Sequence, residues 1–149
     1  MIQNRSKYNV SKNTNKRTYN GIVFDSEMEM KYYRDVILPK YKSGEIIEYK
    51  RQVPYELVPK FKKSNETVRA VVYRADFLVK YNNESEVVID VKGMADSVAK
   101  LKRKLFYYKY PNVNYIWITY VKKYGGWILY DELQKLRRKE KSQKVTERI

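Results

Sequence analysis

The sequence has 149 residues, a net charge of +15, and neither histidine nor cysteine. This length is expected to give one domain with a real core. The missing residue types exclude disulfides, thiolate or imidazole zinc sites, and nucleophile systems that rely on histidine. No apolar run approaches the length of a membrane span, and the first residues lack a basic-then-apolar pattern, so we expect neither a membrane span nor a signal peptide. We therefore expect no membrane partner and a reducing, cytoplasmic setting.

The positive charge is concentrated at the two ends of the chain. Residues 1–24 contain five basic residues and no acid, and residues 135–149 contain seven basic residues and two acids. Such an excess favours a polyanionic partner, most often nucleic acid, although solvated tails that aid solubility are the alternative. We predict a flexible basic arm over 1–20, a folded domain over 21–134, and a basic C-terminal tail over 135–149.

The first predicted element is a helix over residues 24–38. Asp25 or Ser26 can cap its start, and Pro39 should end or kink it. Glu29 falls on the helix stripe that is expected to pack inward, where a carboxylate needs a partner. The alternative is a capping box, in which Glu29 bonds back to the helix start near Ser26.

The next segments have the alternation of β-strands. A strand is predicted over 45–57, where Pro54 suggests an edge position or a bulge. Residues 60–67 have the composition of a polar loop. Two further strands, over 68–81 and 87–93, flank a short polar turn and predict a hairpin.

This hairpin brings acids together. The odd-numbered residues of both strands are apolar, so an odd loop length is needed to keep them on one face. A three-residue loop pairs Asp76 with Asp90, whereas a five-residue loop pairs Asp76 with Lys92. In either register the three side chains are neighbours, about 5 Å apart when directly opposed. Two such carboxylates repel unless a cation bridges them or one stays protonated. The alternative is a solvated face of ion pairs.

The rest of the chain completes an α/β pattern. A helix is predicted over 96–110, strands over 113–121 and 125–130, and a basic helix over 131–141. The order of helix, three strands, helix, two strands and helix predicts a mixed central sheet flanked by helices.

The helix over 96–110 has two predicted faces. Its apolar face should contain Val98, Leu101, Leu105 and Tyr108. Its opposite, cationic face should contain Lys100, Arg103, Lys104 and Tyr107.

Taken in order, Glu29, Asp76 in "RADF" and Asp90-x-Lys92 in "VIDVKG" resemble the PD-(D/E)xK nuclease superfamily. The blocks "GIVFDSEMEMKYY", "GEIIEYKRQVPYEL", "YRADF", "VIDVKG" and "KLKRKLF" resemble small phage recombination endonucleases or Holliday-junction resolvases over about residues 20–120. Acid-x-base triplets recur in this chain, so the ordered set of blocks carries the resemblance. It implies a restriction-endonuclease-like core in the order αβββαβ.

The resemblance also implies a set of catalytic residues. Asp76 and Asp90 would be metal ligands, with Glu29 as an additional acid that binds directly or through water. Lys92 would lie beside the attacking water, and Gln52 would lie near the site. The chain has neither histidine nor cysteine, so carboxylate oxygens are the metal ligands it can offer. Mg²⁺ is therefore the expected ion, with Mn²⁺ able to substitute.

The expected function is therefore a magnesium-dependent DNA endonuclease. The resemblance implies a structure-selective enzyme of the Holliday-junction resolvase type, in phage recombination or replication in the host cytoplasm. A resolvase would act on branched DNA as a homodimer, and the cationic helix face would hold the DNA backbone. Two alternatives stay open: a sequence- or end-specific nuclease of the same fold, and a non-catalytic basic protein that binds DNA or RNA.

Overall fold

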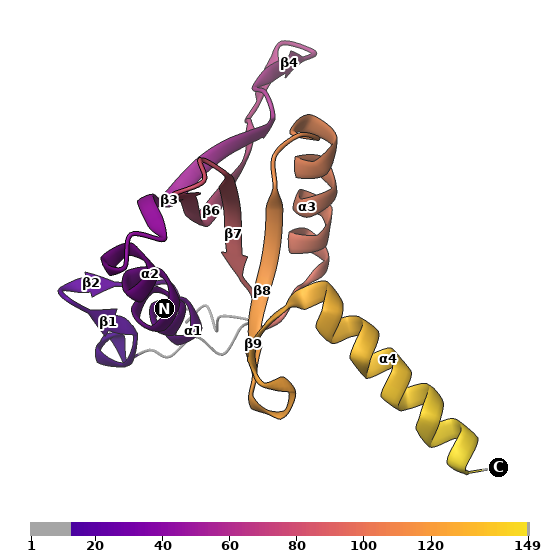
Figure 1. Cartoon of the computed structure of the whole chain (residues 1–149). Helices are drawn as coiled ribbons and strands as arrows, with labels where there is room; N and C mark the ends of the chain where they lie inside the picture. Colours follow the sequence, from indigo (N-terminus) through magenta and orange to yellow (C-terminus); the bar gives the residue numbers. More distant parts are fainter. Residues whose placement is uncertain (1–12, 149) are drawn as a thin grey trace.

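The computed structural model describes residues 13–148 and contains a five-stranded sheet (Figure 1). Its spatial order is β3–β6–β7–β8–β9. The β7–β8 pair is parallel and the other neighbouring pairs are antiparallel. This confirms the predicted α/β class with a mixed sheet. The strands are β3 (Ile46–Val58), β6 (Val71–Tyr81), β7 (Glu86–Val91), β8 (Tyr115–Val121) and β9 (Gly126–Leu129).

The first helical segment is longer than predicted. It consists of α1 (Glu27–Tyr32), a π-helical stretch η2 (Tyr33–Ile37) and α2 (Leu38–Lys42). Of the two effects predicted for Pro39, ending the helix is wrong, because Pro39 lies in the first turn of α2; the irregular stretch η2 instead precedes it. The wide turns of η2 come directly before the proline, whose missing N–H would interrupt a continuous α-helix.

The sheet separates two apolar cores. The first lies under α1, η2 and α2 and contains Phe77, Val79, Ile89 and Val91. The second lies beside α3 (Ser97–Lys109) and contains Tyr73, Ala75, Val88, Phe106, Tyr115 and Trp117. The apolar odd-numbered residues of β6 thus divide between the cores, contrary to the prediction that they share one. The division falls at Asp76.

The predicted orientation of α3 is wrong. Val98 and Leu101 are each 58% exposed, and Tyr108 is 88% exposed, although the helical pattern predicts all three on the buried face. Phe106 is instead fully buried, in a cluster of aromatic rings. The helix therefore turns its Phe106 side toward the sheet and presents an apolar stripe to solvent.

The predicted polar loop over 60–67 is a β-hairpin. Strand β4 (Phe61–Lys63) pairs antiparallel with β5 (Glu66–Val68). This hairpin continues the ribbon of β3 and β6 beyond the rest of the sheet, at the top of Figure 1.

Parts of both ends of the chain have regular structure in the described residues. Residues 1–12 of the predicted arm lie outside the described part, but residues 14–17 form a short 3₁₀-helix, and β1 (Thr18–Tyr19) pairs with β2 (Ile22–Val23). The predicted tail is the outer part of α4 (Tyr130–Glu147), which projects away from the sheet (Figure 1). Among the residues described, no helix is both long and apolar enough to cross a membrane.

A candidate metal centre beside the central hairpin

The register of the β6–β7 hairpin matches the three-residue loop. Phe77 is opposite Ile89, and the Tyr81 N–H donates to the Ser85 carbonyl at 2.8 Å. The ladder stops at the Phe77–Ile89 pair. Beyond this pair, the Val91 N–H donates to Oδ2 of Asp76 at 2.8 Å. The Asp76 side chain thus takes the place of the backbone carbonyl that a continued ladder would supply. Asp76 consequently lies where the two strands separate.

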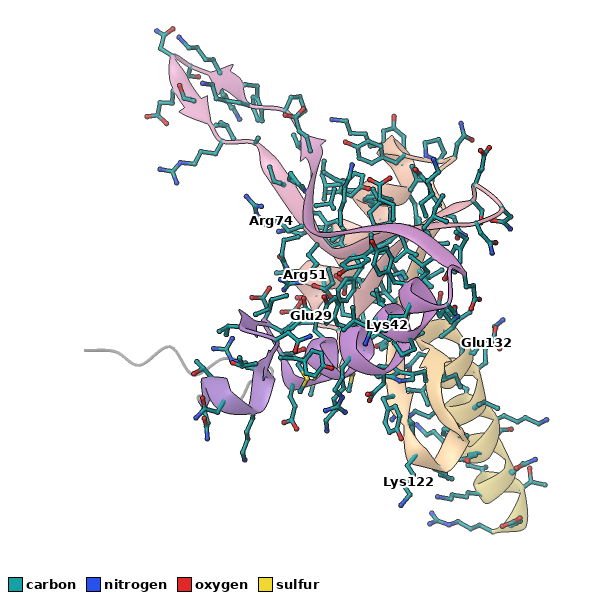
Figure 2. The ribbon with its side chains drawn as sticks, turned by 60° about the vertical axis from the view of Figure 1, so that its left-hand side comes forward. Glu29, Lys42, Arg51, Arg74, Lys122 and Glu132 are labelled. Atoms are coloured by element: carbon teal, nitrogen blue, oxygen red, sulfur yellow. The ribbon has the colours of Figure 1, made fainter. Side chains whose placement is uncertain are left out.

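Helix α1 carries the second acid to this place. Ser26 is the N-cap, and its hydroxyl accepts the Glu29 N–H at 3.0 Å, which is one half of the capping box. Glu29 is 1% exposed, and its carboxylate turns toward β3. It accepts a hydrogen bond from Gln52 Nε2 at 3.3 Å, and Arg51 Nη2 lies 3.7 Å away (Figure 2). Glu29 therefore points inward, as the helix pattern predicted.

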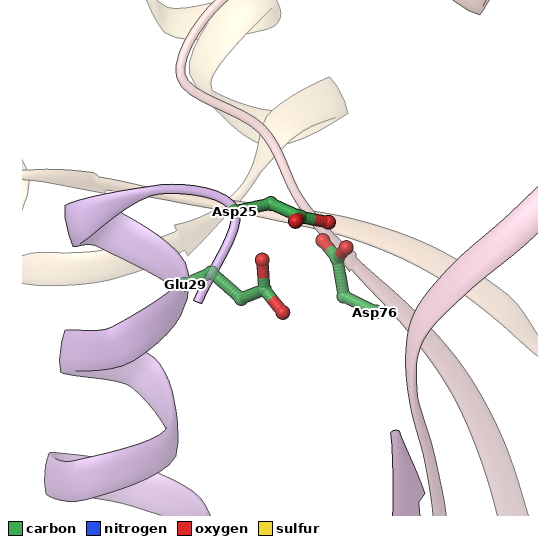
Figure 3. Close-up of side chains that lie close together, drawn as sticks. All are labelled: Asp25, Glu29 and Asp76. Carbon is green, nitrogen blue, oxygen red and sulfur yellow. The ribbon is translucent and has the colours of Figure 1, made fainter. Parts of the chain in front are cut away.

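Three carboxylates converge between the helix and the hairpin. Figure 3 shows Asp25, Glu29 and Asp76 directed into a common space, and one carboxylate oxygen from each lies within 4.8 Å of the others. The predicted ligand set contained Asp90 in place of Asp25. The sequence pattern indicates Asp25 only as a possible helix cap. Asp25 lies before the N-cap residue Ser26 and so outside the helix, and helical periodicity therefore gave no signal for it.

Asp90 lies on the other side of Asp76, with Lys92. Asp90 is buried; the Tyr73 hydroxyl donates to its Oδ1 at 2.7 Å, and Lys92 Nζ lies 2.8 Å from its Oδ2. Asp90 thus forms an ion pair with Lys92 and is next to the triad of acids. Asp76 is the residue common to both groups.

A cleft of about 290 Å³ opens at Asp76, between the ends of the hairpin strands and the start of α3. Aromatic rings of Tyr73, Tyr115 and Trp117 line the cleft, together with side chains of positive and of negative charge. Lys102 is held at the rim of the cleft by a hydrogen bond from its Nζ to the Val72 carbonyl at 3.1 Å. The charged residues that line the cleft are Arg74, Asp76, Asp90, Lys92, Asp96 and Lys102.

The protonation of the acids reflects their crowding. Burial, followed by the nearby Asp25 carboxylate, raises the pKa of Glu29 to about 7, although Arg51 and Gln52 act in the opposite direction. Burial, followed by the negative charges of Asp90 and Glu29, holds the pKa of Asp76 well above its usual range. Without a cation, these side chains therefore retain protons that an isolated carboxylate would lose near neutral pH.

The acid triad fits a hard divalent cation. Ligands of Mg²⁺ lie about 2.1 Å from the ion, so two of them are at most about 4.2 Å apart. The span of 4.8 Å between the carboxylate oxygens would close to this value by a shift of roughly half an ångström. A set made only of carboxylate oxygens suits Mg²⁺ or Mn²⁺ better than softer metals.

Gln52 holds an unusual backbone conformation beside the cluster. Its φ of 53° lies in the left-handed region, although it belongs to strand β3. It lies between the paired residues Arg51–Phe77 and Val53–Ala75. A residue with a side chain in this region costs about 1 to 3 kcal/mol, and such residues gather at functional sites. Here the strained residue donates to Glu29, which supports a functional rather than a merely structural cluster.

The predicted DNA-binding face of α3 is only partly open to solvent. Lys100, Lys104 and Tyr107 are exposed. Arg103 instead lies over the ring of Trp117 at 4.1 Å and pairs with Asp131 at 3.0 Å. Arg103 therefore fastens α3 to neighbouring elements, and the other three residues form the accessible part of this surface.

In the absence of divalent metal, the free energy of unfolding should fall as the pH rises from about 5 to about 7.5. Glu29 binds its proton more tightly in the folded chain than at its ordinary pKa of 4.5, so unfolding releases a proton in this window. The difference corresponds to up to roughly 3 kcal/mol, and Asp76 acts in the same direction. Urea unfolding in EDTA at both pH values measures the loss.

The Glu29→Gln variant is the control for this pH dependence. It keeps the size of the side chain and removes its titration, so stability should vary less with pH than in the wild type. Adding Mg²⁺ should stabilise the wild type most at the higher pH, because the metal binds the ionised acids. An identical pH dependence in both proteins would contradict the assignment.

The sheet, its helices and the triad define a mixed α/β protein with a candidate metal centre between α1 and the central hairpin. The chain belongs to the family described as "Protein of unknown function (DUF1064)", which matches residues 5–126. The matched segment includes the acid triad, Lys92 and the β4–β5 hairpin, and it ends at the start of β9. No curated protein matches this chain. The family description names no nuclease, so the nuclease resemblance remains a prediction.

Proposed function

We propose that this protein is a metal-dependent DNA endonuclease that hydrolyses phosphodiester bonds. One observation carries the proposal: Asp76 joins the Asp25–Glu29 pair on one side to the Asp90–Lys92 ion pair on the other, at the mouth of a charged cleft. A structural role would be served better by neutralised or apolar residues, because buried carboxylates without enough counter-charge destabilise a fold.

The acid triad would hold the metal. Asp25, Glu29 and Asp76 present the oxygens, and Gln52 and Arg51 orient the Glu29 carboxylate by direct contacts. A bound divalent ion would supply Lewis-acid chemistry at the phosphodiester.

Lys92 supplies a positioned positive charge. Asp90 holds its ammonium group, which also lies 5.1 Å from the centre of the Trp117 ring. Tyr73 fixes the other oxygen of Asp90 through its hydroxyl, whose pKa is raised by burial and by the Asp90 charge, so that it remains a donor. In this position Lys92 can hydrogen-bond the attacking water or stabilise the charge that develops on the phosphate.

The cations around the cleft would bind the DNA backbone. Arg74 and Lys102 lie at the rim, and Lys100 and Lys104 extend the positive surface along α3. Contacts of this kind position a duplex without reading its sequence. We infer a branched-DNA substrate and a homodimer from the resemblance to resolvases, since a junction offers two strands to cut.

Wild-type protein should cut a synthetic four-way junction only when Mg²⁺ or Mn²⁺ is present. The Asp90→Asn variant should cut at least about 100-fold more slowly than the wild type, because Lys92 loses the carboxylate that holds it in place. The matched control is Asp35→Asn, which removes an exposed acid paired with Arg34 on η2 and should cut normally. Cleavage rates on denaturing gels compare the three proteins.

The same assay separates the alternatives. Equal cutting of linear duplex would favour a sequence- or end-specific nuclease over a resolvase. Binding of both DNAs without cleavage in either metal would favour a non-catalytic nucleic-acid-binding protein. Full activity of Asp90→Asn would mean that the catalytic residues lie elsewhere.

A further inference from the structure

The β4–β5 hairpin forms an arm outside the body of the protein. Strand β7 pairs with β6 only from residue 77 onward, whereas the ribbon of β3 and β6 continues to Val58 and Val71. The hairpin extends that ribbon further, and residues 60–69 are all exposed. Figure 2 shows it projecting at the upper left, away from the helices.

The arm has a defined shape. Ser64 and Asn65 have φ values of 49° and 65°, and they connect the paired residues Lys63 and Glu66. Two consecutive residues in the left-handed region make the type I′ turn that matches the twist of a tight hairpin. The arm is thus a preorganised two-stranded ribbon.

Its two faces differ in charge. Lys62 is opposite Thr67, and Phe61 is opposite Val68. Strand alternation places Lys60 and Arg69, which flank the ladder, on the side of Lys62. One face therefore carries the three cations without an acid. The other carries the apolar pair of Phe61 and Val68 together with the Lys63–Glu66 pair.

The arm extends from the metal centre for nearly the length of one turn of DNA. Thr67 lies nine positions before Asp76 in the sequence, which corresponds to at most about 30 Å of extended strand. One helical turn of B-DNA is about 34 Å. Arg74 lies between the two places, and Figure 2 shows it on the ribbon between Glu29 and the arm. Cations thus follow the ribbon from the cleft to the tip.

We propose that the β4–β5 hairpin is a duplex-binding arm, which lies in a groove of the DNA about one helical turn from the phosphate that is cut. A two-stranded ribbon fits the width of the major groove, and the Lys60–Lys62–Arg69 face would contact the phosphates. This inference rests on the proposed function, and it identifies the substrate as one with at least a full turn of duplex beside the cleavage site.

The lack of cysteine allows a direct test. The Thr67→Cys variant carries one attachment point, on the cationic face of the arm, for an iron–EDTA reagent that breaks nearby DNA. The control is Ser142→Cys, an exposed position on α4. On a four-way junction with long arms, Thr67→Cys should give breaks about 10 base pairs from the position that the wild type cuts in Mg²⁺. Ser142→Cys should give no breaks at that distance.

The outcomes distinguish this inference from the proposed function. Breaks from the arm without Mg²⁺-dependent cutting would support the arm and overturn the nuclease. Mg²⁺-dependent cutting without breaks from the reagent on the arm would overturn only the inference about the arm. Breaks spread evenly along the DNA would do the same. Absence of both would overturn both proposals, and it would also contradict DNA as the partner of the arm.

A charge variant gives an independent measure. The triple variant K60A/K62A/R69A should reduce the magnitude of the negative slope of log affinity against log salt by about two to three, as expected for three lost phosphate contacts. The triple variant R138A/K141A/K144A removes the same charge from α4. Duplex binding by fluorescence anisotropy in EDTA compares them. An equal loss in both variants would mean that only net charge matters, and it would overturn the arm as a specific contact.

Discussion

The Asp76→Asn variant is expected to lose metal-dependent cleavage, with a rate at least about 10³-fold below that of the wild type. Asp76 is the side chain shared by the acid triad and the cleft. Removing its charge weakens metal binding and also changes the cleft beside Asp90. A loss of about 4 kcal/mol in transition-state stabilisation corresponds to this factor. Single-turnover cleavage of the substrate, at saturating protein and Mg²⁺, measures the change.

A second measurement separates lost chemistry from lost structure. The asparagine oxygen can still accept the Val91 N–H, so the hairpin should stay intact. In EDTA the variant should be as stable as the wild type or more stable, because one source of repulsion among the acids is gone. Mg²⁺ should raise the melting temperature of the wild type but not of the variant. An equal rise in both proteins would place the metal elsewhere.

The Phe106→Ala variant should lose about 3 to 5 kcal/mol in the free energy of unfolding. Phe106 is fully buried, and its ring centre lies 4.3 Å from that of Tyr115 and 5.1 Å from that of Tyr55. Truncation leaves a cavity that these rigid rings cannot fill. Urea unfolding in EDTA, where metal binding contributes nothing, measures the loss.

Tyr108→Ala is the matched control on the same helix. Tyr108 is 88% exposed, so its removal should change stability by no more than about 0.5 kcal/mol. The two variants together test which side of α3 packs on the sheet. A large loss at Tyr108 with a small loss at Phe106 would show that the helix packs in the orientation predicted from sequence.

The β6–β7 hairpin and the inward direction of the Glu29 side chain could both be predicted from the sequence. Because side chains alternate along a strand, only odd loops keep the apolar residues of β7 and the adjacent part of β6 together, and the three-residue loop is the one observed. Glu29 follows the period of an α-helix and shares its inward side with Tyr33, which is buried as well. Both predictions depend on strict local periodicities.

The failures occur where tertiary contacts override the sequence pattern. On α3, Arg103 stacks on Trp117, so a residue counted as polar belongs to the inner side of the helix. Asp25 precedes α1, and only the packing of α1 against the hairpin brings it to Asp76. The β4–β5 hairpin consists of three-residue strands around a turn without glycine, which gave no clear alternating signal.

Pro54 has a consequence for how two copies of this chain could associate. It lies within β3, at the edge of the sheet, opposite Arg74. A proline has no N–H to offer, so a second copy cannot add a continuous strand along this border. The opposite border, β9, has four residues. Two copies of this chain would therefore gain little from pairing their sheets edge to edge.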